Sequence, residues 1–275
     1  MNSPVIQISG LKKSFGAHVV LDDVTLEVAA GRTLALLGRN GCGKTTTIRT
    51  LLGLLEPDAG TLRVADCNPA REAIELRRRV GYLAEDQEMY PWMTPVELCG
   101  FLAPFYPDWD QKLADELLDR FEVPRQTLIG RLSKGQSVEL GLASALAHRP
   151  SLVILDDPTL GLDPVARKQF NRHLVEHLQA EGRTVLYSSH LLAEVEAVAD
   201  DVAILDRGRI VRTGTTDDLR RQVQRFIVPT DALGEVAAPT GLLDVDRSGE
   251  QTAVIVDQAP AFERYLRGLE IPFDV

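Results

Sequence analysis

The stretch Gly38-Arg39-Asn40-Gly41-Cys42-Gly43-Lys44-Thr45-Thr46 decides the fold of this chain. It fits the pattern G-x-x-x-x-G-K-[ST], with an apolar run at 33–37 before it and a helix-compatible run at 46–55 after it. Strand, glycine loop and helix in this order are the context in which the pattern grips nucleotide phosphates. The alternative is a glycine-rich turn with a chance Gly-Lys-Thr, and the flanking segments argue against it.

The chemistry of a triphosphate accounts for these residue types. Glycines let backbone N–H groups turn toward the phosphates because no Cβ blocks the approach. A helix beginning near Lys44 adds the positive end of its dipole, roughly half an elementary charge. Lys44 can reach the β- and γ-phosphates as a point charge. The Thr45 hydroxyl can ligate Mg²⁺, which prefers oxygen. We therefore expect a nucleoside triphosphate and Mg²⁺ as ligands.

The composition narrows the possible partners. The chain has 275 residues, 44% hydrophobic and 25% charged, which is enough for a full core and one appendix. Its net charge of −10 argues against a nucleic-acid partner, which needs clustered Lys and Arg. Cys42, Cys67 and Cys99 lack metal-ligand spacing and are odd in number, as in a reduced, cytosolic chain. Cys42 is either a reactive thiol or a small filler, and we favour the filler.

No segment of the sequence indicates a membrane anchor. No apolar run approaches the ~20 residues that span a bilayer. Residues 1–10 lack the basic-then-apolar layout of a signal peptide. If the protein serves a membrane process, we expect another chain to supply the membrane part.

The order of elements predicts an α/β fold. A helical block is expected between about 86 and 147, with capping-box starts at Thr94-Pro95-Val96-Glu97 and Ser133-Lys134-Gly135-Gln136. A turn is expected at 12–17 and a small appended module after about 221, with two strands in 243–256 and a helix at 261–269. Further strands are expected at 5–8, 19–28, 33–37, 61–64, 80–84, 152–155, 184–187, 202–205 and 210–213, and a helix at 71–79.

Polar residues follow several of the predicted strands. Glu85 and Asp86 lie at a strand's carboxyl end, where ligands of open α/β sheets gather. Leu152-Val153-Ile154-Leu155 suits a parallel strand covered on both faces. Asp156 and Asp157 at its tip are costly unless a cation such as Mg²⁺ needs them, the alternative being that they cap the next turn. His190 follows another strand and is better explained as a γ-phosphate contact than as a structural histidine.

Phe15 has two possible roles near the start of the chain. Its ring could stack on a flat base or pack in the small sheet. The residues alone favour packing.

Five signals stand in one order: the phosphate loop, the Glu85 segment, Leu132-Ser133-Lys134-Gly135-Gln136, the strand ending in Asp156-Asp157, and His190. Together they resemble the ATP-binding subunit of ABC transporters over roughly residues 4–220. Residues 160–164 and the tail resemble the ABC-2 type exporter branch. The resemblance implies a P-loop NTPase domain at 1–220, with a RecA-like, mostly parallel sheet, an antiparallel β subdomain and the inserted helical subdomain at about 86–147. A small α+β appendix would occupy 221–275.

The resemblance also implies how the protein works. Two subunits, identical or different, would sandwich two ATP molecules head to tail. Each ATP would lie between one phosphate loop and the partner's Ser133 helix, whose N-terminus favours the γ-phosphate. ATP would close the dimer and hydrolysis would release it, driving an integral-membrane permease on a separate chain. The protein would then lie at the cytoplasmic face of the cell membrane.

The roles of individual residues follow by resemblance. Phe15 resembles the adenine-stacking aromatic, Asp157 the catalytic carboxylate, His190 the switch histidine and Asp163 the residue linking the two sites. The remaining matches form three groups: Gly38, Arg39, Asn40, Gly41, Cys42, Gly43, Lys44, Thr45 and Thr46 for phosphate; Thr45, Asp156 and Glu85 for Mg²⁺; and Ser133, Gly135 and Gln136 for the partner's ATP. Glu85 is also expected to be a catalytic residue, with Asp157 and His190.

Three departures from the family pattern affect the chemistry. Glu85 stands where the family usually has Gln, Lys134 replaces a glycine, and Asp157 replaces the catalytic Glu. A general base must lie within about 2.6–3.2 Å of its water, and Asp is one methylene shorter. We expect a slow ATPase. The alternatives are a subunit that binds ATP without hydrolysing it, and a non-transport ABC ATPase. The second of these usually has two cassettes or a long insertion, which this chain lacks.

Overall fold

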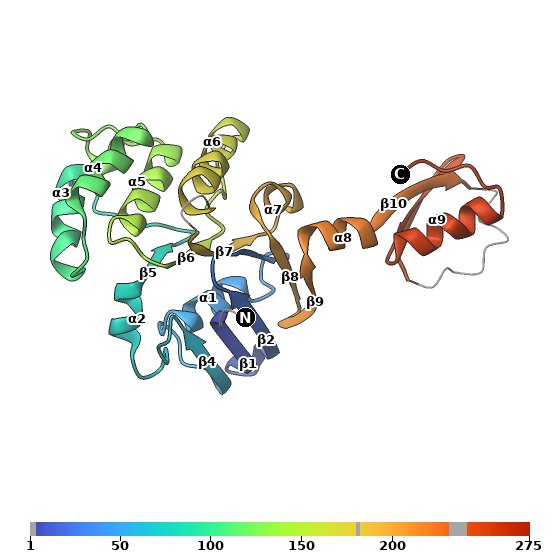
Figure 1. The fold of residues 1–275 in the computed structure, drawn as a ribbon, viewed down its shortest axis with the longest axis horizontal. Helices are drawn as coiled ribbons and strands as arrows, with labels where there is room; N and C mark the ends of the chain where they lie inside the picture. The colour runs from blue at the N-terminus through green and yellow to red at the C-terminus, as the bar shows by residue number, and fades with distance from the viewer. Residues whose placement is uncertain (1–3, 180–181, 231–240) are drawn as a thin grey trace. The chain divides into compact units, whose positions relative to one another are not determined.

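The computed structural model describes residues 4–179, 182–230 and 241–275, and it divides the chain into two compact units, Met1–Thr213 and Gly214–Val275 (Figure 1). The larger unit contains a six-stranded sheet in the order β5-β6-β7-β3-β8-β9. The neighbours from β5 to β8 pair in parallel. The strands are β3 (Thr33–Leu37), β5 (Val80–Leu83), β6 (Leu152–Asp156), β7 (Thr184–Ser189), β8 (Asp201–Asp206) and β9 (Arg209–Thr215).

A second, antiparallel sheet has the order β2-β1-β4, with β1 (Pro4–Phe15), β2 (His18–Ala29) and β4 (Ala59–Val64). The predicted turn at 12–17 is wrong over most of its length. Strand pairing continues to Phe15 and His18, so that only two residues turn the chain. Gly16 has φ 59°, which a tight reversal needs and which glycine adopts without steric cost.

The helices of the larger unit connect these strands: α1 (Lys44–Leu51), α2 (Ala73–Arg79), α3 (Pro95–Leu102), α4 (Gln111–Arg120), α5 (Lys134–Leu146), α6 (Pro164–Leu174) and α7 (Leu192–Val198). Helix α1 is shorter than the expected run to 55, because Gly53 leaves the helix with φ 64°. Both predicted capping boxes are confirmed. The Thr94 and Ser133 side chains accept from the backbone N–H of Glu97 and Gln136, whose side chains accept in return from the cap residues' backbone N–H groups.

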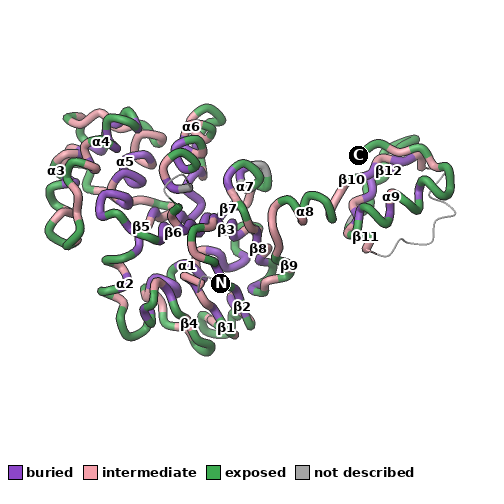
Figure 2. Tube along the Cα trace, viewed as in Figure 1, coloured by how far each residue is buried: buried purple, intermediate pink, exposed green. Residues whose placement is uncertain are grey.

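The central strands are buried on both faces (Figure 2). In β6, Leu152 and Ile154 pack into a core with α1 and the antiparallel sheet. Val153 and Leu155 pack into a second core with α3, α4, α5 and α6. The alternation follows from the two-residue period of a strand. It confirms that the four-residue apolar run is covered on both sides.

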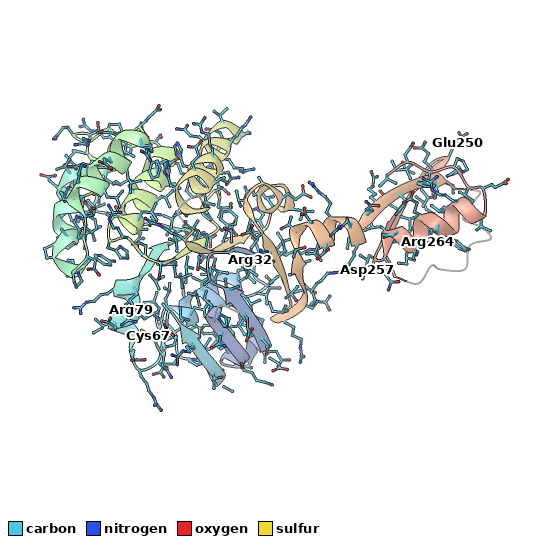
Figure 3. The ribbon with its side chains drawn as sticks, viewed as in Figure 1. Arg32, Cys67, Arg79, Glu250, Asp257 and Arg264 are labelled. Atoms are coloured by element: carbon cyan, nitrogen blue, oxygen red, sulfur yellow. The ribbon has the colours of Figure 1, made fainter. Side chains whose placement is uncertain are left out.

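An ion pair anchors the start of the strand that leads into the glycine loop (Figure 3). Arg32 donates from Nε and Nη2 to the two carboxylate oxygens of Asp201, at 2.5 and 2.6 Å. The neighbouring Asp200 accepts from the backbone N–H of Thr33 at 2.8 Å. A bidentate contact fixes direction as well as distance. The start of β3 is therefore held in register with β8.

The smaller unit contains α8 (Thr216–Gln222), β10 (Gln224–Pro229), β11 (Leu242–Ser248), β12 (Gln251–Val256) and α9 (Ala259–Gly268). Its antiparallel sheet has the order β10-β12-β11. The two strands around Ser248-Gly249 and the helix after them are confirmed. Strand β10 was not predicted, although Phe226 and Val228 alternate along it and pack with Phe262 of α9. Among the described residues, every helix is too short or too polar to cross a bilayer.

Candidate functional site

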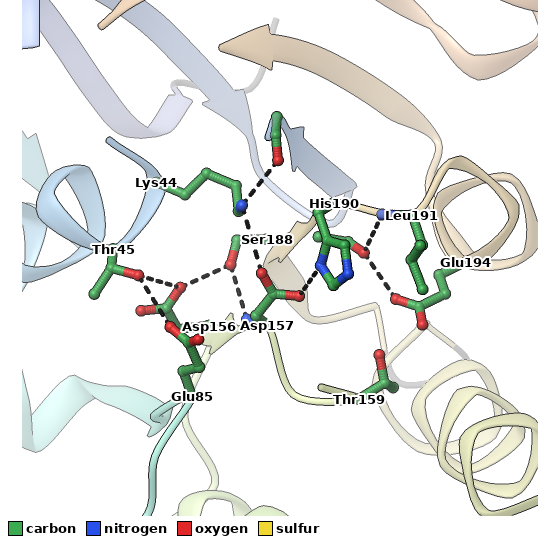
Figure 4. A network of polar contacts seen from close by, with 12 residues as sticks. Lys44, Thr45, Glu85, Asp156, Asp157, Thr159, Ser188, His190, Leu191 and Glu194 are labelled. Carbon is green, nitrogen blue, oxygen red and sulfur yellow. Dashed lines mark hydrogen bonds and ion pairs between the residues drawn. The ribbon is translucent and has the colours of Figure 1, made fainter. Parts of the chain in front are cut away.

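The polar residues that the sequence singles out converge at the carboxyl ends of three adjacent strands (Figure 4). Strands β6, β7 and β3 are neighbours in the sheet, although β3 comes first in the chain. Their ends carry Asp156 and Asp157, Ser188 to His190, and the glycine loop. Parallel neighbours bring such residues to one edge of the sheet, where ligands of open α/β folds bind.

The glycine loop has a conformation that side chains would prevent. A Cβ on Gly38 would lie 2.4 Å from the Leu205 carbonyl oxygen, and one on Gly43 would lie 2.6 Å from Leu21. Gly43 also has φ 113°, which L-residues with side chains rarely adopt. Gly43 is the cap residue of α1, and its carbonyl accepts from the Thr47 N–H at 2.9 Å. The predicted loop-to-helix junction is confirmed.

Lys44 places a buried positive charge at the centre of the site. Its side chain is 6% exposed, and Nζ donates to the Gly38 carbonyl at 2.8 Å. The same atom lies 3.5 Å from Oδ2 of Asp157. A buried ammonium must be paired, and here a backbone carbonyl and one carboxylate oxygen do so.

Asp156 lies beside Thr45 and Glu85. Its Oδ1 accepts from Thr45 Oγ1 at 3.3 Å and from Ser188 Oγ at 2.8 Å, while Thr45 Oγ1 lies 3.5 Å from Glu85 Oε2. The second oxygen, Oδ2, is buried without a hydrogen-bond partner. Burial raises the pKa of Asp156, and burial followed by the charge of Asp156 raises the pKa of Glu85. An unpartnered buried carboxylate oxygen next to a hydroxyl and a second carboxylate is a donor set that fits a divalent cation.

These donors suit a Mg²⁺ ion that is also bound by water and phosphate, rather than a metal ion that protein ligands alone would hold. In the part of the chain that the structure describes, no three His, Cys, Asp or Glu side chains form a group that holds a metal ion on its own. Mg²⁺ is commonly held by one or two carboxylates, with waters and substrate phosphates completing its shell. The neighbouring phosphate loop provides room for that arrangement.

Asp157 and His190 face each other across the site. Nδ1 of His190 lies 3.0 Å from Oδ1 of Asp157, and the Asp157 N–H donates to Ser188 Oγ at 2.8 Å. The backbone of Asp157 has φ 43°, in the left-handed region. Asp and Asn tolerate this region better than longer side chains do, because their short polar groups hydrogen-bond locally. The local backbone therefore gives a physical reason for Asp at this position.

Ser133, Gly135 and Gln136 lie away from this cluster, at the capped start of α5. They line a 190 Å³ pocket together with residues of α6. Asp163 caps α6, and its Oδ1 accepts from the backbone N–H groups of Val165 and Ala166 at 2.9 Å each. A buried contact joins the two helices, with His173 Nδ1 2.9 Å from Glu139 Oε1.

The side chain of Lys134, at the start of α5, lies against Gly161, which shortly precedes α6. Nζ of Lys134 lies 2.5 Å from the position that a Cβ would take on Gly161. The missing side chain of Gly161 therefore leaves room for the lysine that replaces a family glycine.

The remaining predicted residues lie at the edge of the site. Phe15 is 52% exposed, with the Lys13 ammonium 5.6 Å from the centre of its ring, so that packing in the small sheet is wrong. Arg39 and Asn40 are exposed on the loop. Cys42 is buried and burial raises the pKa of its thiol, which supports a filler rather than a reactive group.

Sequence reasoning missed several residues that organise the site. Ser188 bridges the two aspartates, donating to Asp156 and accepting from the Asp157 N–H. Glu194 is buried beside Tyr187 and Ser189. Two serines directly after an apolar strand were a usable signal for Ser188. Nothing local in the sequence indicated that Glu194 points inward.

Comparison with known proteins agrees with this geometry. Residues 21–160 match the family described as ABC transporter. The bacitracin transport ATP-binding protein BcrA of Bacillus licheniformis is 34% identical, covering 82% of this chain and 74% of that protein. The daunorubicin resistance ATP-binding protein DrrA3 of Streptomyces coeruleorubidus is 34% identical and covers 98% of this chain and 89% of its own length.

A solved structure titled as the ATP binding subunit of an ABC transporter superposes with a TM-score of 0.71 at 33% identity. It covers 79% of this chain and 92% of that one. The chain thus belongs to the ATP-binding proteins of the ABC transporter family, with relatives in the ABC-2 type exporter branch.

Proposed function

We propose that this chain binds and hydrolyses ATP to drive export through a permease on a separate chain, at the cytoplasmic face of the membrane. One observation carries the proposal: the buried Lys44 ammonium, the Thr45 hydroxyl and the unpartnered oxygen of Asp156 meet at one edge of the sheet. Such a group of charges suits a nucleotide phosphate with its cation. Relatives named for bacitracin transport and daunorubicin resistance support export.

Each ligand has residues that suit it. Thr45, Asp156 and Glu85 would hold Mg²⁺, which neutralises phosphate charge when bound. The loop from Gly38 to Thr46 would surround the phosphates, and the exposed ring of Phe15 would stack on the adenine.

The dimer is proposed from helix α5, which Ser133 caps. Ser133 and Gln136 satisfy each other's backbone groups at the tip of α5, while Ser133 stays exposed. A helix start of this kind favours an anion, and no residue of the phosphate loop is among those that line its pocket. A second copy placed head to tail would present its γ-phosphate there. A charge-assisted hydrogen bond is worth ~1.5–3 kcal/mol, and ADP lacks the group that would receive it.

The permease is proposed to dock beside the Glu85 segment. A 380 Å³ groove there is lined by parts of β5, α3 and α5 and by Asp86 and Gln87, which directly follow Glu85. Next to it lies a run of exposed rings: Tyr90 is 5.3 Å from Trp92 and 5.4 Å from Phe101, and Phe101 is 5.5 Å from Phe105. Exposed aromatic surface of this kind marks an interaction site. The groove adjoins Glu85, a proposed Mg²⁺ ligand. Binding of nucleotide and Mg²⁺ would therefore affect the surface on which the permease docks.

Hydrolysis is proposed to be slow. Asp157 is the proposed general base, but Lys44 and His190 both contact its short side chain. The same contacts favour the second candidate function, a clamp that closes on ATP without hydrolysing it.

The first prediction concerns Mg²⁺. Asp156→Asn should weaken the Mg²⁺-dependent part of ATP binding at least about tenfold, the scale on which even outer-shell partners change metal affinity. Titration calorimetry with ATP in Mg²⁺ and in EDTA measures it. Asp86→Asn is the matched control outside the proposed ligand set and should behave as wild type. An unchanged Mg²⁺ dependence in Asp156→Asn would remove Asp156 from the metal site.

The second prediction separates the slow ATPase from the clamp. Asp157→Asn keeps the left-handed backbone but removes the base, so kcat should fall by ~10²–10⁴-fold. Asp157→Glu restores the missing methylene and should raise kcat, while its backbone strain lowers the free energy of unfolding by ~1–2 kcal/mol. Phosphate release assays and thermal denaturation measure both. If Asp157→Asn turns over at the wild-type rate, Asp157 is not the base.

The third prediction tests the dimer in the Asp157→Asn background, where ATP persists. Ser133→Ala should abolish the ATP-dependent shift from monomer to dimer in light scattering. The chain offers a matched control in Thr94→Ala, which removes the other capping box at a similar cost of ~0.5–2 kcal/mol. Thr94→Ala should still dimerise. A Ser133→Ala protein that dimerises equally well contradicts the head-to-tail arrangement.

The fourth prediction tests the permease. The tagged protein, purified from solubilised membranes of the source organism, should bring down an integral-membrane chain. Replacing Trp92 and Phe105 by serine should reduce its recovery several-fold, because such anchors dominate interfaces. Val211→Ser, at an equally exposed site in β9, is the control. Recovery of the same chain by the double variant would exclude this docking surface.

A further inference from the structure

Glu194 is a buried carboxylate to which the proposed reaction assigns no role. It lies in α7 and is 3% exposed. Burying a charge is costly unless it is paired and hydrogen-bonded, and an apolar side chain would fill the same space at lower cost. Its contacts therefore indicate what the carboxylate is for.

One oxygen of Glu194 holds the end of β7. Oε2 accepts from Ser189 Oγ at 2.7 Å and from the Tyr187 hydroxyl at 3.1 Å. Ser189 Oγ accepts in turn from the Leu191 N–H at 3.0 Å. The Ser189 hydroxyl thus donates to Glu194 and accepts from the Leu191 N–H (Figure 4). Because Ser189 and Leu191 flank His190, these two hydrogen bonds hold the backbone on either side of the histidine.

The other oxygen of Glu194 reaches helix α6. Oε1 lies 2.9 Å from Nε of Arg167, which neutralises the buried charge. Arg167 is in the first turns of the helix that Asp163 caps, and its backbone N–H donates to the Asp163 carbonyl at 3.0 Å. One carboxylate therefore connects the His190 backbone to the helix that begins at Asp163.

We propose that Glu194 is a positioning residue for His190. It holds the His190 backbone so that Nδ1 stays 3.0 Å from Asp157, and through Arg167 it keeps that backbone in fixed relation to α6. The inference rests on the proposed role of His190 in ATP hydrolysis. Glu194 itself touches neither Asp157 nor the phosphate loop in any of these contacts, so that its proposed effect on the reaction is indirect and passes through His190.

The test compares ATPase kinetics of Glu194→Ala, Glu194→Gln and His190→Ala. Glu194→Ala should lower kcat by about 10–100-fold, the range for loss of a supporting contact or a misplacement near 1 Å. The ATP concentration at half-maximal rate should change less than about threefold, because the phosphate loop is intact. Glu194→Gln keeps an oxygen acceptor for Ser189 and Tyr187 and should recover part of the rate. Glu196→Ala, an exposed carboxylate on the same helix, is the control.

The double variant Glu194→Ala with His190→Ala distinguishes a positioning role of Glu194 from a general loss of protein stability. In the His190→Ala background, Glu194→Ala should cost no further activity, since residues that act as a unit are not additive. Independent, multiplying losses would overturn the proposal. If Glu194→Ala fails to fold, Ser189→Ala removes the hydrogen bonds of Ser189 to Glu194 and Leu191 and leaves the Glu194–Arg167 ion pair intact. In the His190→Ala background, Ser189→Ala should likewise cost no further activity.

A second readout does not depend on catalysis. The chain has five histidines, and the imidazole NMR signals of His190 are identified by their loss in His190→Ala. Glu194→Gln and Ser189→Ala should shift these signals, whereas Glu196→Ala should not. If the wild-type protein shows no ATPase activity, the proposed hydrolysis is refuted. If the His190 signals nevertheless shift in these variants, the positioning role is upheld. Unchanged His190 signals would refute the positioning role whatever the ATPase rate.

Discussion

The structure depends on an excess of buried and half-buried negative charge at one edge of the central sheet. Glu85, Asp156 and Asp157 gather there around a single buried ammonium, that of Lys44. Burial raises the pKa of both Asp156 and Glu85, and the charges of neighbouring carboxylates raise it further. A cation that shares the carboxylates and an anion that shares the lysine would offset the cost of burying these charges. Mg²⁺ with a nucleotide phosphate meets both needs.

The rest of the larger unit keeps those charges in place. Strands β6 and β7 are buried on both faces, so their tips cannot retreat from the site. Ser188 ties the two aspartates together, and Glu194 ties the next residues to helix α6. The hydrogen bonds of Ser188 and Ser189 satisfy polar groups that burial would otherwise penalise. Stability and positioning are therefore achieved by the same hydrogen bonds.

The start of helix α5, by contrast, lies apart from this cluster. Its start is capped by its own side chains, and Lys134 extends from it across Gly161 toward the loop before Asp163. These groups complete one another but contact no residue of the phosphate loop in the interactions that the structure describes. In the proposed head-to-tail pair, the phosphate loop of one subunit and the start of α5 of the other would each supply half of an ATP site. In this proposal, affinity between subunits comes from the nucleotide rather than from a permanent interface.

The sequence by itself determined whatever depends on neighbours along the chain. The glycine loop, the bounds of β3, both capping boxes and the two-sided burial of β6 follow from allowed φ angles, side-chain reach over three residues and the two-residue strand period. Only the tertiary structure decided that Ser188 bridges the aspartates, that Glu194 points inward, that Phe15 is exposed and that Asp157 adopts a left-handed backbone. The physical reason is that these features are set by which segments the fold packs together. Ser188 meets the aspartates because the sheet places β7 between β6 and β3, an order that the chain does not follow.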